Sequence, residues 1–229
     1  MSRALDLVTS YTSTVFSLGF GFIAHVESHE PEKPLELYEF ESCPFCRKTR
    51  EGFSEMDISP MIYPCPRDGT RFRPRAIELG GKRQFPFLVD PNTGTQMYES
   101  IDILRYVSDT YADGKRPLAA RGGPLSTARS MFVSLPRGRV AAAGASRTPE
   151  EPLTLYSFEA SPYCRIVREA LSRLEIPYRL INVAKKSRNR AAFVERSGKM
   201  MVPYIVDPNT KTEMFESADI VKYLYSTYG

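Results

Sequence analysis

One unit is written twice in this chain of 229 residues. Residues 85–111 align with residues 202–228 at a constant offset of 117, and 15 of the 27 aligned positions are identical. Upstream, residues 35–51 align with residues 153–169 at an offset of 118. A period this long exceeds that of a solenoid repeat, so it indicates two copies of a domain of roughly 80 residues.

The repeat predicts how the chain is divided. We expect a partly helical lead-in at 1–33, a first domain at 34–113 and a second domain at 152–229. Polar, proline-rich stretches precede both domains and indicate linkers. The linker at 114–151 is expected to contain a short helix that begins near Ser126.

Each copy has the same pattern of expected elements. A strand with alternating apolar and polar residues leads to Pro44 or Pro162, which occupies the favoured first position of a helix. A second strand, a basic helical stretch, two more strands and an amphipathic helix follow. This order predicts an α/β fold with two tandem domains, each a four-stranded mixed sheet flanked by helices on both faces.

Composition narrows the function classes. The chain is 42% hydrophobic and 25% charged, as in ordinary globular proteins, and its net charge of +4 comes from basic residues scattered among acids. Nucleic-acid binding would require a denser basic stripe. The apolar run at 15–26 is too short to span a bilayer. Four cysteines, two of them in a C-x-x-C pair, are typical of redox or metal chemistry in a reducing compartment. We therefore expect an intracellular, soluble, cytoplasmic protein, with an organellar location left open.

The motifs together resemble a known family. Both copies have a strand, then C-P-F-C or S-P-Y-C at a helix start, an apolar-Pro-apolar strand, and Glu-Ser opening the last helix. This combination resembles the glutaredoxin branch of the thioredoxin superfamily and, more closely, the glutathione-binding N-terminal domain of glutathione S-transferases. Those transferases continue into an all-helical domain, whereas here a second copy follows. The resemblance implies a thioredoxin-like fold, glutathione as co-substrate and no metal.

Cys43 and Cys46 are the candidate catalytic residues. A cysteine at a helix start faces unsatisfied N–H groups and the positive end of the helix dipole, which favour the thiolate. Arg47 and Lys48 would add positive charge. Cys46 lies one turn further on, within reach of Cys43. We therefore predict that Cys43, open to solvent, is the attacking thiolate and that Cys46 is the resolving thiol of glutathione-dependent thiol–disulfide exchange.

Other interpretations of this pair stay open. A C-x-x-C pair can be half of a zinc site, for which His25 and His29 would supply the other half. Iron–sulfur binding occurs in some glutaredoxin relatives. The two cysteines could also be inert core residues.

The resemblance also assigns ligand-binding positions. Pro86 and Pro203 match the family's cis-proline, and the Glu-Ser pairs match residues that hold the γ-glutamyl end of glutathione. A helix N-terminus suits a carboxylate, although Glu-Ser can equally serve as a helix cap. The expected glutathione-binding residues are Phe85, Pro86, Glu99, Ser100, Val202, Pro203, Glu216 and Ser217.

The second copy has Ser161 at the position of Cys43, while Cys164 keeps the position of Cys46. Serine cannot exchange disulfides, but it is among the best N-cap residues. The second domain is therefore either a degenerate scaffold or a site where Ser161 stabilises a glutathione thiolate.

Two further features flank the first site. Cys65 ends the second strand of its domain and is either a second partner of Cys43 or a small apolar residue. Arg71, Arg73 and Arg75 make the next loop basic, which suits a carboxylate ligand or a solvated surface.

The sequence is consistent with three functions. The leading one is a glutaredoxin-like oxidoreductase that acts on glutathione and on disulfide-bearing proteins. The alternatives are a glutathione transferase or isomerase, because C-P-F-C also occurs in prostaglandin E synthase relatives of this fold, and a non-catalytic module that binds glutathione or a partner. The oligomeric state is open.

Overall fold

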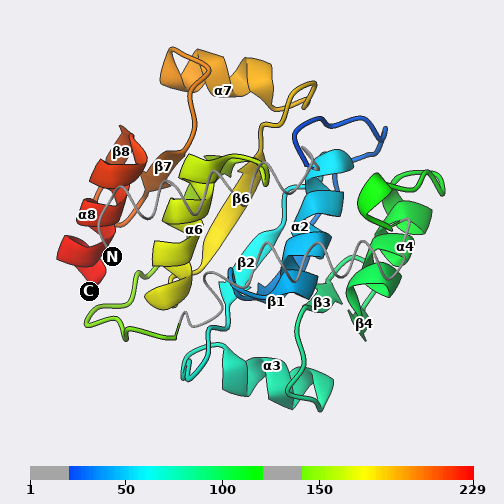
Figure 1. The fold of residues 1–229 in the computed structure, drawn as a ribbon, viewed down its shortest axis with the longest axis horizontal. Helices are drawn as coiled ribbons and strands as arrows, with labels where there is room; N and C mark the ends of the chain where they lie inside the picture. Colours follow the sequence, from blue (N-terminus) through cyan, green and yellow to red (C-terminus); the bar gives the residue numbers. More distant parts are fainter. Residues whose placement is uncertain (1–20, 121–140) are drawn as a thin grey trace.

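The computed structural model describes residues 21–120 and 141–229, in which the two copies form two similar units (Figure 1). The first unit consists of β1 (Glu36–Glu39), α2 (Pro44–Glu55), β2 (Met61–Pro64), α3 (Arg73–Gly80), β3 (Phe87–Asp90), β4 (Thr95–Tyr98), α4 (Ser100–Tyr111) and the 3-10 turn η1 (Leu118–Ala120). The second unit consists of β5 (Leu153–Ser157), α6 (Pro162–Arg173), β6 (Tyr178–Asn182), α7 (Arg190–Ser197), β7 (Tyr204–Asp207), β8 (Thr212–Phe215) and α8 (Ser217–Tyr228). The predicted order of elements is confirmed in both units.

The eight strands form one continuous sheet in the order β4-β3-β1-β2-β6-β5-β7-β8. Within each unit the first two strands are parallel and the last two are antiparallel to their neighbours. The units join where β2 runs antiparallel to β6, with Met61 opposite Arg179. These two residues are equivalent at an offset of 118, so a local twofold axis passes between them. The sequence did not predict this junction.

The two faces of the sheet are packed differently. On one face, α2 packs against α4 and α6 against α8, and a single apolar core extends under all four helices. Leu37 of β1 and Leu155 of β5 point into this core. On the other face α3 and α7 lie far apart, each over a separate aromatic cluster (Figure 1). Tyr38 follows Leu37 on the strand and lies in the cluster under α3, as the alternation of a strand requires.

The segments that precede the units cross over to the opposite unit. Ile23 forms a parallel bridge with Lys185, and Ala141 forms the equivalent bridge with Arg67, again at an offset of 118. In the described part of the lead-in, residues 21–33, no helix forms. The rest of the lead-in and the expected linker helix near Ser126 lie outside the described residues. None of the helices in the described ranges has the length and apolarity to cross a bilayer.

Candidate functional site

Strand register places the predicted site residues of the first unit at the same end of three neighbouring strands. Tyr38 of β1 lies opposite Phe87 of β3, which lies opposite Tyr98 of β4. The loop to Cys43 leaves the end of β1, Pro86 precedes Phe87 in β3, and Glu99 follows Tyr98. The C-P-F-C turn, the cis-proline position and the Glu-Ser pair therefore lie at the same end of the sheet's strands.

Cys43 is the N-cap of α2. Its sulfur accepts a hydrogen bond from the backbone N–H of Cys46 at 3.4 Å and lies 3.9 Å from the carbonyl oxygen of Phe85. The Phe85–Pro86 and Val202–Pro203 peptide bonds are both cis, which confirms that prediction. All four cysteines of the chain are free thiols.

The two sulfurs of the C-x-x-C pair have opposite electrostatic environments. The Cys46 side chain, as hydrogen-bond donor, lowers the pKa of Cys43 most, and the backbone N–H groups of Cys46 and Phe45 add to this against burial and the Glu39 carboxylate. Burial raises the pKa of Cys46 well above that of an ordinary thiol, and the Cys43 sulfur raises it further. The arrangement therefore makes Cys43 ionise more readily than an ordinary thiol and Cys46 less readily. The Arg47 side chain forms an ion pair with Glu51 at 3.1 Å, and its effect on Cys43 stays a prediction.

Cys43 is much less accessible than expected at a helix tip. Its exposed fraction is only 5%, because it lies between the turn that closes on Phe40 and the Phe85 carbonyl. The Phe40 and Phe85 rings meet edge to face, and the Arg73 guanidinium lies 4.8 Å from the centre of the Phe85 ring. The expectation of a sulfur open to solvent is therefore wrong for this conformation.

The Glu-Ser pairs have a backbone conformation that a helix cap does not require. Glu99 and Glu216 precede α4 and α8 with φ of 68° and 67°, a region that non-glycine residues rarely occupy. Neither side chain caps its helix. The Glu99 carboxylate instead accepts a hydrogen bond from Gln84, next to the cis-proline segment. Such strain often marks a ligand-binding position, so this geometry favours the ligand interpretation over the cap.

The second unit repeats this frame without the attacking sulfur. Ser161 is the N-cap of α6 and accepts a hydrogen bond from the Cys164 N–H at 3.2 Å, as Cys43 does from Cys46. Cys164 is fully buried, and this burial raises the pKa of its thiol. Serine therefore preserves the helix start while removing thiol chemistry.

The Cys65 thiol donates to a backbone carbonyl and not to Cys43. It is fully buried in the aromatic cluster under α3, and burial raises the pKa of its thiol. Its S–H group is directed at the Tyr63 carbonyl, 3.5 Å away. This supports its interpretation as a small apolar residue.

The two histidines lie at the wrong end of α2 for a zinc site with the C-x-x-C pair. The backbone N–H of His25 bonds to the carbonyl of Glu55, the last residue of α2. The 12 residues of α2 separate that point from Cys43 by about 18 Å. Across residues 21–120 and 141–229, no group of three or more metal-binding side chains comes together.

The three arginines of the basic loop, Arg71, Arg73 and Arg75, have different binding partners. Arg71 donates to the backbone carbonyl of Glu175 in the second unit at 2.9 Å, so it serves the contact between units. Arg75 bonds to Tyr38, which raises the pKa of the Arg75 guanidinium. Only Arg73 lies at the site, where it donates to the Cys65 carbonyl at 3.1 Å and stacks on Phe85.

Sequence reasoning missed a buried cluster of charges behind the site. Its members lie between α2 and α6, with exposed fractions of 3% or less except Glu159 at 5%. They include Glu39, Glu41, Arg50, Glu159 and Arg168, and Arg165 and Arg47 lie 3.6 and 4.0 Å from Glu41 and Glu159. Burial raises the pKa of Glu39 to about 7, despite the neighbouring Arg50. The available signal was that Glu41 and Arg50 recur in the second copy as Glu159 and Arg168.

Comparison with known proteins agrees with this geometry. The sequence model of the family described as "Glutathione S-transferase, N-terminal domain" matches residues 37–116 and again residues 155–229. The chain is also similar to the glutathione S-transferase-like protein tpcF of Aspergillus fumigatus, with 32% identity over 78 residues. This match covers 34% of the chain and 34% of the length of that relative. No solved structure matches.

Proposed function

Since the chain belongs to the glutathione S-transferase N-terminal domain family, we propose that its first unit is a glutathione-dependent thiol–disulfide oxidoreductase. The observation that carries the proposal is the division of roles between two sulfurs one helical turn apart. Hydrogen bonds stabilise the thiolate at Cys43, whereas burial keeps Cys46 neutral.

The reaction proceeds by two displacements. The Cys43 thiolate attacks one sulfur of a disulfide, forms a mixed disulfide with it and releases the other sulfur as a thiolate. Cys46 then loses its proton and attacks Cys43, which releases the bound group as a thiol and leaves a Cys43–Cys46 disulfide. Two glutathione molecules reduce this disulfide and are oxidised to one glutathione disulfide.

The surroundings of Cys43 favour small substrates. A sulfur that is 5% exposed and lies 3.9 Å from the Phe85 carbonyl admits a slender disulfide more readily than a folded protein surface. The strained Glu99 and the basic Arg73 would meet the charged ends of a glutathionyl group. We therefore assign glutathione mixed disulfides of small thiols as the first substrates to test, with disulfide-bearing proteins as the comparison.

A redox titration in glutathione buffers, followed by peptide mass spectrometry, tests this function. We expect a glutathione adduct on Cys43 in the Cys46→Ser variant and a Cys43–Cys46 disulfide in the unaltered protein. Cys65→Ala is the matched control, which should leave both products in place. An adduct on another cysteine, or none on Cys43, would contradict the proposal.

The second unit supports a second candidate function. Its Ser161 hydroxyl occupies the helix-tip position, and strand register places the cis Val202–Pro203 bond and Glu216, with φ of 67°, at the same end of the strands. A serine there could donate a hydrogen bond to a glutathione thiolate and support transfer to an electrophile. Conjugation that survives in Cys43→Ser and is lost in Ser161→Ala would favour this transferase. Glutathione binding without either activity would favour a non-catalytic binding module.

A further inference from the structure

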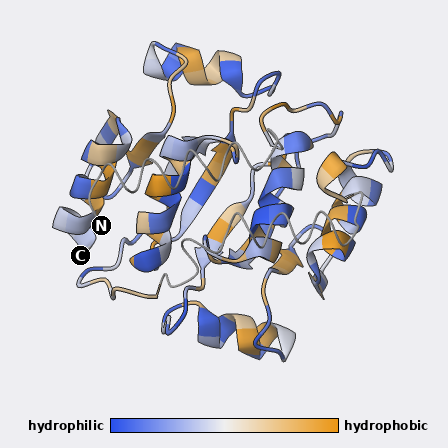
Figure 2. Ribbon diagram, viewed as in Figure 1, coloured by the Kyte–Doolittle hydropathy of each residue, from blue (hydrophilic) through white to orange (hydrophobic). Residues whose placement is uncertain are grey.

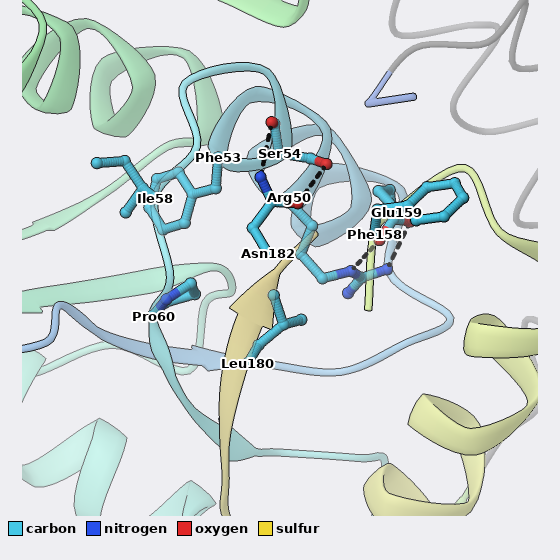
Figure 3. A pocket seen from close by; sticks show the side chains of 9 residues that line it. All are labelled: Arg50, Phe53, Ser54, Ile58, Pro60, Phe158, Glu159, Leu180 and Asn182. Carbon is cyan, nitrogen blue, oxygen red and sulfur yellow. Dashed lines mark hydrogen bonds and ion pairs between the residues drawn. The ribbon is translucent and has the colours of Figure 1, made fainter. Parts of the chain in front are cut away.

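Helix α2 is polar and yet buried. Figure 2 shows mostly hydrophilic colours along it, although every residue from Cys46 to Glu55 is buried. Buried charges are costly unless they are paired. The pairing partners of the Arg50 guanidinium include Glu159 of the second unit, toward which it reaches in Figure 3.

The ion pairs between the units are reciprocal. Glu41 lies two residues before Cys43 and accepts hydrogen bonds from Nε and Nη2 of Arg168, at 3.0 and 3.3 Å. Glu159 lies two residues before Ser161 and accepts from Nε of Arg50 at 2.9 Å. Each helix-start turn is therefore held by an arginine from the other unit.

Three arginines lie against Glu41, but Arg165 is 3.6 Å away, whereas Arg168 and Arg50 come within 3.0 and 3.1 Å. Arg50 binds three carboxylates, those of Glu39, Glu41 and Glu159. Only its Nη2 atom contacts Glu41, at 3.1 Å. In the second unit, Ser157 stands at the position of Glu39, and Arg168 Nη1 bonds to its hydroxyl at 3.2 Å. Arg168 also reaches Glu159. It nevertheless gives Glu41 two hydrogen bonds, so it is the main partner of that carboxylate.

Glu41 is part of the turn that sets the position of Cys43. The backbone N–H of Cys43 donates to the carbonyl of Phe40 at 3.1 Å, which closes a turn with Glu41 as its second residue. The Glu41 side chain is 2% exposed. Its burial would raise the pKa of the carboxyl, but Arg168 and Arg50 outweigh burial and lower it to about 2. The turn is thus anchored by a carboxylate that stays ionised.

We propose that Arg168 of the second unit is a positioning residue for Cys43: through Glu41 it fixes the Phe40–Cys43 turn, and with it the helix tip that holds the sulfur. The role of this residue in exchange rests on the proposed function. This role would explain how the second unit contributes to catalysis without an attacking cysteine, because Arg168 of its helix α6 supports the site of the first unit.

The competing explanation is a direct effect of charge on the thiol. Arg168→Gln removes a positive charge and Glu41→Ala removes a negative one, so a purely Coulombic influence would shift the pKa of Cys43 in opposite directions. Positioning through the turn predicts that both variants raise this pKa. The double variant should then resemble the single variants, because both break one connection.

The measurement is the pH dependence of Cys43 alkylation in the full-length protein, resolved by peptide mass spectrometry. We expect roughly three- to tenfold slower alkylation at pH 7 in both single variants, the size expected when a helix-tip interaction is lost. Arg168→Lys should restore part of the rate. Asn182→Ala is the matched control, because it removes a buried 2.7 Å contact between the units, to Asp57, at the far end of α2. It should lower stability and leave the Cys43 profile unchanged.

Opposite shifts in Arg168→Gln and Glu41→Ala, or unchanged profiles in both, would overturn the proposal. If Arg168→Gln does not fold, Glu41→Ala decides alone, because Arg168 then keeps Glu159 and Ser157 as partners. Formation of the glutathione adduct on Cys43 in the Cys46→Ser variant distinguishes failure of the positioning role from failure of the oxidoreductase function. An adduct with no shift in the variants removes only the positioning role, and a shift without any adduct removes only the oxidoreductase function.

Discussion

Replacement of Glu39 by glutamine should make the protein more stable above neutral pH. The Glu39 carboxyl is fully buried, and burial raises its pKa from 4.5 to about 7. In the unfolded chain this group ionises near its ordinary value, so between pH 4.5 and 7 the folded state binds more protons than the unfolded state. The free energy of unfolding therefore falls as the pH rises through this window.

The size of the effect follows from the two pKa values. The difference between 4.5 and about 7 corresponds to about 3 kcal/mol. Glutamine resembles the protonated acid, so Glu39→Gln and the unaltered protein should be similarly stable at pH 4.5. At pH 8 the variant should be more stable by up to about 3 kcal/mol.

Urea unfolding from pH 4.5 to pH 8 measures this difference. Glu78→Gln makes the same change of charge on an exposed helical position and is the control, for which we expect a flat difference. A gap between Glu39→Gln and the unaltered protein that does not widen with pH would refute the assignment of a destabilising carboxylate at this position.

Three further single substitutions and one compensating substitution test other parts of the structure. Cys43→Ser should abolish the Cys43–Cys46 disulfide formed in glutathione buffers with little change in unfolding free energy, because Ser161 already caps α6 in the same geometry; a large loss of stability would contradict this. Gly52→Ala should cost about 1–3 kcal/mol in urea unfolding, since the new Cβ would clash with the Leu104 side chain. Adding Leu104→Val should recover part of that loss, because the second unit pairs Ala170 with Val221 at these positions. In Asp90→Asn, weakening the 2.6 Å hydrogen bonds from Tyr106 and Tyr111 should cost about 1–3 kcal/mol at pH 7. Burial opposes ionisation of Asp90, but these tyrosines lower its pKa, so the cost should shrink in acid; a constant cost would count against this role.

The repeat made most of the fold predictable. Two aligned copies gave the same element order twice, and Pro44 and Pro162 marked the helix starts that the structure confirms. Pro86 and Pro203 lie between apolar residues ahead of a strand, and both bonds are cis as the resemblance implied. The division at 34–113 and 152–229 stays a prediction, close to the matched family segments.

The contact between the two units could not be predicted from the repeat. The pairing of β2 with β6 depends on unsatisfied backbone groups at two strand edges, which no side-chain pattern records. Arginine side chains are mostly exposed in folded proteins, whereas Arg50 of α2 is buried against Glu159. The exposure of Cys43 was misjudged because the Phe40 turn and the Phe85 carbonyl close around it. Only the recurrence of Glu41 and Arg50 at an offset of 118 hinted at a paired role.

The most direct test of the account is the order in which the four cysteines of the native protein react with a small alkylating agent as the pH rises. Selective modification of Cys43 near neutral pH, at a midpoint below that of an ordinary thiol, is the predicted result. Cys46, Cys65 and Cys164 should stay unmodified until the protein unfolds. If Cys43 is alkylated only after the protein unfolds, or titrates like a thiol free in water, the first unit does not hold a reactive thiolate and the oxidoreductase function is wrong.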